Sequence, residues 1–113
     1  MKRAEFITVE DEEDLVVSFA IAPSAYRSLT LLRSPQYEFL LPEEERGTTV
    51  SFGPNEERDL LVLVHWYEAS VVIKTERHEY QLDISAVEDE EITEAKAVLR
   101  KMVQDGTAHF KEA

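Results

Sequence analysis

The chain has 113 residues, 43% of them apolar and 32% charged, and it contains no cysteine. This size and composition predict a single globular domain, residues 1–113, and exclude a disulfide framework, a thiolate metal site and a cysteine nucleophile. The formal net charge is −12, and nowhere does the chain cluster the Lys and Arg that phosphate groups require. We therefore expect no binding to nucleic acid and none to an anionic membrane surface.

No segment has the apolar length of a signal peptide or of a membrane span. The N-terminal stretch MKRAEFITVEDEED lacks an apolar core, and the longest aliphatic run, Leu60 to Val64, has only the length of a strand. These features predict a soluble, cytoplasmic protein. The acidity by itself favours solubility, and the alternative interpretation is an acidic surface that meets a basic partner.

The N-terminal segment alternates apolar and polar residues with a period of two, which predicts strands. Residues 4–9 are expected to form a short strand, Val9 to Asp14 a charged turn, and residues 15–22 a second strand. The second strand has an apolar face, and its other face is small but not very polar, which is typical of a strand inside a sheet. The apolar face comprises Leu15, Val17, Phe19 and Ile21.

The segment from Pro23 to Pro35 allows two interpretations. Its first proline would start a short helix that places Ala25, Leu29 and Leu32 on one side. Alternatively, residues 28–33 are a strand that runs into a turn. Of the two, we favour the helical turn.

The next segment contains short elements separated by polar loops. Tyr37 to Leu41 is predicted to be extended, and Pro42 with the acidic residues after it ends that element. Thr48 to Phe52 is predicted to be a strand, and residues 53–59 a loop between strands.

Residues 60–84 predict a three-stranded meander. Two-residue turns at Glu68-Ala69 and Glu76-Arg77 place apolar residues opposite apolar residues and opposite charges opposite each other. A slip of one residue would remove this match on both faces. The expected cross-strand pairs are Trp66 with Val71, Val64 with Ile73, Ile73 with Tyr80, Val71 with Leu82, and Lys74 with Glu79. The apolar face is expected to comprise Val62, Val64, Trp66, Val71, Ile73, Tyr80, Leu82 and Ile84.

Residues from about 86 to 105 predict a helix, followed by a short tail at 106–113. Ser85 and Glu88 match a capping box, the charges oppose the helix dipole at both ends, and Gly106 suits the position after the last turn. A helix of this length spans about 30 Å and can fold back over the apolar face of the meander. Its apolar stripe comprises Val87, Ile92, Ala95, Val98, Leu99, Met102 and Val103.

Together these elements predict an α+β fold. The expected architecture is a mostly antiparallel, meandering sheet of about six to eight strands, with one long C-terminal α-helix packed on one face. The β-rich part is expected to cover residues 1–84.

The chain shows no pattern that is typical of a catalytic, cofactor or metal site. His65 and His78 lie on opposite faces of the predicted meander, so they cannot ligate one metal ion. The fragment HEYQL, which begins at His78, lacks the second histidine of a zinc motif and lies on a strand. The acidic run Glu10 to Asp14 lacks the glycine and the spacing of a calcium loop. We expect no cofactor and no bound metal.

One predicted surface lacks a structural explanation. Leu61, Leu63, His65 and Val72 are expected to share the face of the meander that points away from the helix. Either the N-terminal strands of a rolled sheet cover these residues, or the residues form an interface with another copy or with a partner.

The sequence therefore favours a non-enzymatic protein-interaction module that acts through a protein partner or through self-association as a homodimer. One alternative is a small hydrolase or isomerase-like enzyme with a site around His65 and a nearby carboxylate. A second alternative is an acidic inhibitor of the immunity type, which would block a basic nuclease surface.

Overall fold

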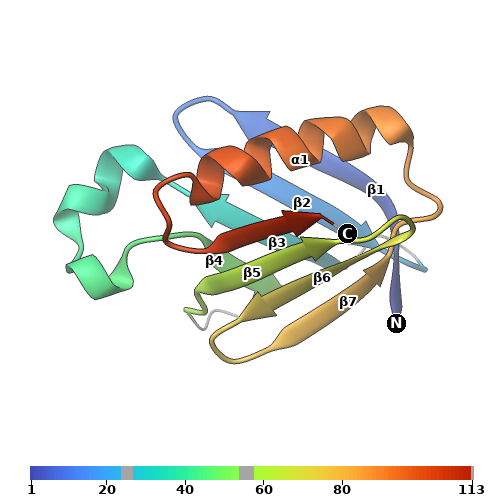
Figure 1. Cartoon of the computed structure of the whole chain (residues 1–113), viewed down its shortest axis with the longest axis horizontal. Helices are drawn as coiled ribbons and strands as arrows, with labels where there is room; N and C mark the ends of the chain where they lie inside the picture. The colour runs from blue at the N-terminus through green and yellow to red at the C-terminus, as the bar shows by residue number, and fades with distance from the viewer. Residues whose placement is uncertain (24–26, 54–57, 113) are drawn as a thin grey trace.

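The structure, a computed structural model, describes residues 1–23, 27–53 and 58–112. Within these residues, eight strands form one sheet in the order β4-β3-β2-β1-β7-β6-β5-β8, accompanied by one α-helix (Figure 1). Neighbouring strands are antiparallel except in the pairs β1–β7 and β5–β8. The strands are β1 (Lys2–Asp11), β2 (Leu15–Ile21), β3 (Arg27–Arg33), β4 (Thr49–Phe52), β5 (Leu61–Trp66), β6 (Ser70–Thr75), β7 (Glu79–Asp83) and β8 (His109–Glu112). The predicted α+β class is confirmed.

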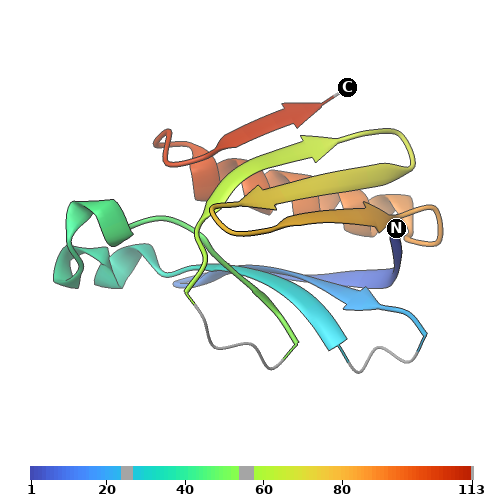
Figure 2. The same ribbon diagram turned by 90° about the horizontal axis from the view of Figure 1, so that it is seen from below.

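The sheet is rolled into two layers, which Figure 2 shows from the edge. One layer contains β1 to β4, and the other contains β5 to β8. The layers meet where Lys2 and Arg3 pair with Leu82 and Asp83, and again at a bridge between Thr49 and Leu60. The core lies between the layers, where the rings of Phe19 and Trp66 pack with their centroids 6.3 Å apart.

The helix α1 (Asp89–Val103) lies along one side of the rolled sheet and contacts β1, β2 and β8. Beyond Arg3, β1 has separated from β7, so its outer backbone groups have no strand partner. The helix supplies one, because the Ile7 amide donates to Glu91 Oε1 at 2.7 Å. The helix therefore fills the space where β1 and β7 diverge. No helix of the described residues has the length and apolarity to cross a membrane.

The meander has the predicted register, with one local correction. All five expected cross-strand pairs are present. A β-bulge lies between Leu61 and Leu63, and the alternation of faces shifts there. Leu61 is consequently only 3% exposed and belongs to the core, whereas Val62 is 39% exposed. The prediction of Val62 as a core residue is therefore wrong.

Two segments before the meander also differ from expectation. Residues 27–33 form β3 rather than a helical turn, because this strand pairs with both β2 and β4 and buries Leu29 and Leu31. The favoured helical interpretation is wrong there, and Ala25 lies outside the described residues. Residues 37–41 are not extended: most of them belong to the 3₁₀ helix η1 (Pro35–Leu40), which a second 3₁₀ helix, η2 (Glu43–Glu45), follows.

The helix is shorter than predicted at both ends. The expected capping box is absent, because the Ser85 amide donates to Asp83 Oδ1 at 2.9 Å in a turn and Glu88 makes no side-chain cap. Beyond the helix, Gly106 takes the left-handed conformation at φ +83°, and the chain returns to pair β8 with β5. The helix is thus not the last element, and the predicted tail contains a strand. Six of the seven residues of the predicted stripe are buried: Val87, just before the helix, and Ala95, Val98, Leu99, Met102 and Val103 within it.

The apolar stripe can be tested by truncation. Leu99 is fully buried, so Leu99→Ala should lower the free energy of unfolding by about 2–5 kcal/mol, as the deletion leaves a cavity. Glu94 is exposed on the opposite side, and Glu94→Ala should change that free energy by about 0.5 kcal/mol or less. Urea unfolding followed by circular dichroism measures both, and equal effects would contradict this packing.

Candidate functional site

The predicted interaction face lies on the outer surface of the layer formed by β5 to β8. Leu63, His65 and Val72 are half-buried there, while the bulge turns Leu61 into the core. The N-terminal strands do not cover this face, because they pack on the opposite, inner side of the layer (Figure 2). Pairing places Lys74 beside Leu63 and Lys111 beside His65. The face is therefore a small apolar strip between two exposed lysines.

His65 contacts an aromatic side chain on this face. Its Nδ1 lies 3.2 Å from the hydroxyl of Tyr67, and the two rings stack with centroids 4.3 Å apart. The carboxylate that an enzymatic site at His65 would require is not among the contacts in the described residues. The described His–carboxylate pair occurs elsewhere, at His78.

The His78 pair belongs to a hydrogen-bonded turn between β6 and β7. Asp59 is 3% exposed, and its Oδ2 lies 2.9 Å from His78 Nδ1 and accepts from Thr75 Oγ1 at 2.6 Å. Its Oδ1 accepts from the backbone N–H of Arg77 at 3.1 Å. Burial opposes ionisation of Asp59, but the hydrogen bonds from His78, Thr75 and Arg77 outweigh it and lower the pKa of this carboxyl.

This network accounts for Asp59 in structural terms. A buried carboxylate is stable where several donors satisfy its oxygens, and here those donors come from one tight turn. The arrangement also orients the His78 ring, whose side chain is 44% exposed. An imidazole held by a carboxylate is half of a nucleophile-activating system. No reactive hydroxyl or thiol lies within hydrogen-bonding reach of that ring in the described contacts.

A second buried charge network holds the segment between β3 and β4. Arg33 is 7% exposed, and its guanidinium forms a two-point ion pair with Glu38 at 2.7 and 2.8 Å. The same group contacts Asp105 at 2.6 and 3.0 Å, Thr107 Oγ1 at 3.2 Å and the Met102 carbonyl. The hydrogen bonds that Arg33 donates to Glu38 and Asp105 raise the pKa of Arg33, and Arg33 in turn holds the pKa of Asp105 well below its usual range.

The Arg33 network fixes the base of an exposed apolar projection. Glu38 points inward to Arg33, with its side chain 16% exposed, while its neighbours on η1 point outward. Tyr37, Phe39 and Leu40 are 57%, 73% and 68% exposed, and we call these three side chains the η1 knob. Figure 1 shows this segment projecting from the end of the molecule that lies away from the N-terminus. The exposed residues of η2, all glutamates, follow directly.

Sequence reasoning missed the knob because the segment was interpreted as extended. In a strand, Tyr37 and Phe39 would lie on one face and Glu38 on the other, which suggests ordinary burial of the aromatic side. The available signal was the pair of prolines, Pro35 and Pro42, which bracket an apolar run and disfavour a central strand.

The search for metal-binding groups and the comparisons with known proteins complete the description of the site. The described residues contain no group of three or more His, Cys, Asp or Glu side chains that could hold a metal ion. Comparison of the chain with protein-family models, curated proteins and solved structures finds no match.

The Asp59 network predicts a pH-dependent contribution to stability. Asp59→Asn should lower the free energy of unfolding at pH 7 by about 1.5–3 kcal/mol, because an amide cannot accept all three hydrogen bonds. The folded-state pKa lies below the ordinary 3.8, so the stabilisation is present above that value and is lost as the pH falls through the folded pKa. Urea unfolding at pH 7 and pH 3 measures the free energies of unfolding of the parent protein and of Asp59→Asn, which should differ less at pH 3. Glu79→Gln, at an exposed position, is the control.

The position of Leu63 on the outer face predicts that the protein tolerates a charged residue there. Leu63 is half-buried at the surface, so a lysine at this position can extend its ammonium into water. Leu63→Lys should leave the circular dichroism unchanged and cost about 1 kcal/mol or less. Sedimentation velocity of both proteins tests self-association through this face, since a homodimer formed there would dissociate in the variant. A variant that unfolds would contradict the position of Leu63 on the outer surface.

Proposed function

We propose that this protein is a protein-interaction module that docks by inserting the η1 knob into an apolar groove with a basic rim on a partner protein. The observation that supports this proposal is the exposure of three large apolar side chains, 57–73%, on one short turn. Isolated apolar residues are common on surfaces, whereas a contiguous group of this size typically marks an interaction site.

The chemistry of the knob suits an anchor at the centre of an interface. Aromatic side chains supply large contact areas at low cost in conformational entropy, and they are enriched among the residues that carry most of the binding energy. Phe39 and Leu40 offer apolar bodies, and Tyr37 adds a hydroxyl for a polar contact at the rim. A groove that buries these side chains would gain about 25 cal/mol for each Å² of apolar surface removed from water.

The charge around the knob defines the rim of the partner's groove. Glu43, Glu44 and Glu45 are exposed next to the knob, and the whole chain carries a net charge of −12. Lys and Arg on the partner would complement these glutamates and speed the encounter. An inhibitor of the immunity type, which blocks a basic surface, is one form that such a module would take.

The Arg33 network adds preorganisation. A flexible loop that becomes ordered on binding loses conformational entropy, which weakens its affinity. Here Glu38 is held by two hydrogen bonds from a buried guanidinium, and the residues on either side of it are the exposed ones. The knob is therefore presented in a defined orientation before a partner arrives.

The partner can be identified by site-specific photocrosslinking. We would replace Phe39 with p-benzoylphenylalanine, irradiate the protein in lysate of its own source cells, and identify the adducts by mass spectrometry. Tyr67, an exposed aromatic residue on the other layer, takes the same substitution as a matched control. We expect one heterologous adduct at position 39 that is absent at position 67. An adduct between two copies would replace the partner with self-association, and the absence of any specific adduct would contradict the proposal.

Binding of the purified partner then tests the knob itself. Phe39→Ala and Leu40→Ala should each weaken binding by at least tenfold, whereas Tyr67→Ala should leave the Kd unchanged. Glu38→Gln should weaken binding without removing any apolar contact, because it loosens the pair with Arg33. Raising the salt concentration should slow association, as expected for a basic rim. Isothermal titration and stopped-flow measurements supply these values.

A further inference from the structure

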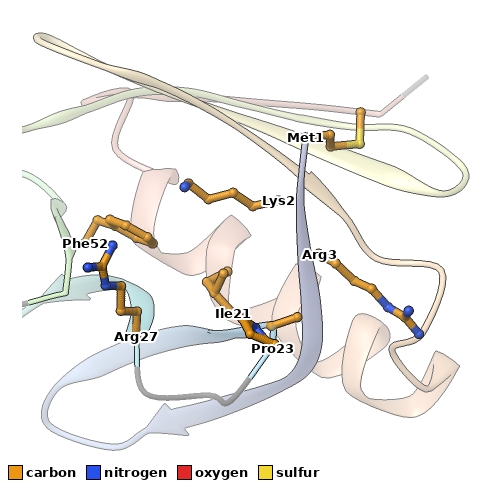
Figure 3. Close-up of a pocket in the computed structure, with 8 residues that line it drawn as sticks. Met1, Lys2, Arg3, Ile21, Pro23, Arg27 and Phe52 are labelled. Atoms are coloured by element: carbon orange, nitrogen blue, oxygen red, sulfur yellow. The ribbon is translucent and has the colours of Figure 1, made fainter.

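A pocket of about 720 Å³ opens between the two layers of the sheet, near the N-terminus. Figure 3 shows it with α1 behind, so it lies on the side of the roll that the helix leaves open. Its wall combines the apolar side chains of Ile21, Pro23 and Phe52 with the cationic side chains of Lys2 and Arg27. Met1 borders this pocket, and the N-terminus lies toward the opposite end of the long axis from η1 (Figure 1), so the pocket is a separate site from the η1 knob.

Strand pairing brings these residues together from distant parts of the chain. The end of β2 is tied to β1 by a hydrogen bond of 2.8 Å from the Ala22 amide to the Arg3 carbonyl. Arg27 begins β3 directly opposite Ile21. Gly53, at φ +64°, directly follows β4, and the stem of Arg27 lies 3.9 Å from the position that a Cβ on this glycine would occupy. The two cations are thus held at one opening by the ends of four strands.

The side chains of the wall differ in where they point. Lys2 extends toward Phe52, with its Nζ 4.9 Å from the ring centroid, and Arg27 lies beside the same ring (Figure 3). Arg3 also borders the pocket, but Figure 3 shows its side chain turned away, and its strand partner is Asp83. Lys2 and Arg27 are therefore the charges that a bound molecule would meet.

The local charge of this pocket is opposite to that of the protein. The chain contains 24 acidic residues and 12 Lys and Arg residues, yet the described wall of the pocket includes cations and no carboxylate. Among the described residues, neither Lys2 nor Arg27 has a carboxylate within ion-pair distance. Positive groups at the edge of an apolar hollow focus a field that attracts anions.

We propose that this pocket binds a small organic anion with an apolar body, such as an aromatic or short acyl carboxylate. The anionic head would lie between Lys2 and Arg27, and the apolar body would pack against Ile21, Pro23 and Phe52. The volume of about 720 Å³ lies within the range of small-molecule sites, roughly 300–1,000 Å³. A planar body would stack on Phe52, a ring that already contacts Tyr80 with centroids 6.0 Å apart.

The proposal is tested with a pair of fluorescent probes that differ in charge. 8-Anilinonaphthalene-1-sulfonate carries an anionic head on an aromatic body, and N-phenyl-1-naphthylamine has a closely similar body without the charge. We expect the anionic probe to bind saturably, at least tenfold more tightly than the neutral probe. Amide chemical-shift changes on titration should centre on Lys2, Ile21 and Phe52. Binding should also weaken as salt is raised from 0.05 to 0.5 M.

Substitution of Lys2 and of Arg27 tests whether these two cations bind the anionic probe. Lys2→Gln and Arg27→Gln should each weaken binding of the anionic probe by about tenfold, since each removes a charge-assisted contact. Lys111→Gln, an exposed lysine on β8, is the matched control and should leave binding unchanged. Lys2 and Arg27 are both exposed at the surface, so the variants should keep the melting temperature of the parent protein.

Three results would overturn the proposal. They are equal binding of the charged and neutral probes, binding that survives both substitutions, and shift changes centred away from β1, β2 and β4. Because this dye also binds partly unfolded chains, unchanged near-ultraviolet circular dichroism at saturation is required before binding is counted as support.

Discussion

The buried guanidinium of Arg33 connects parts of the chain that no strand pairing joins. It extends from the end of β3 and contacts η1 through Glu38, the last turn of α1 through the Met102 carbonyl, and the approach to β8 through Asp105. Removing a cation from water is costly, and here two carboxylates and further acceptors offset that cost. A positive charge at the C-terminus of a helix also interacts favourably with the negative end of the helix dipole. Arg33 therefore contributes to the orientation of η1 relative to the sheet.

The rolled sheet explains where surfaces are available for binding. One roll encloses a single core, so the inner side of each layer is apolar and the outer side carries charged and half-buried residues. The layers separate after the short parallel contact between β1 and β7. Beyond that contact α1 fills the gap between β1 and β7, and beside the contact a pocket opens at Lys2 and Arg27.

Charge separates the two proposed sites. Three exposed glutamates of η2 follow the η1 knob, which suits a basic protein surface, and the pocket presents cations in a chain with a net charge of −12. A general excess of carboxylates favours solubility and repels nucleic acid, so the attraction of an anion depends on the local field of the cations at the pocket. The two sites would therefore recognise different classes of molecule without competing.

Local patterns determined much of the fold from sequence alone. The period-2 alternation of residues 15–22 predicted a strand with an apolar face, and the two tight turns of the meander set its registers, because a slip of one residue would reverse the faces of each strand. The helical stripe through Leu99 was equally clear, since its period of 3.6 repeats over several turns. These signals act between residues close in sequence, so they can be interpreted without knowledge of the rest of the chain.

Tertiary structure decided the remainder. β3 is a strand because β2 and β4 pair with its two edges. The 3₁₀ conformation of η1 directs Glu38 toward Arg33, which also binds Asp105. The bulge between Leu61 and Leu63 reversed the predicted positions of Leu61 and Val62, and β8 formed because β5 offered a free edge. The knob and the pocket depend on contacts between residues far apart in sequence. Such contacts have no periodic signal, and they exist only once the sheet has rolled and the helix has packed against it.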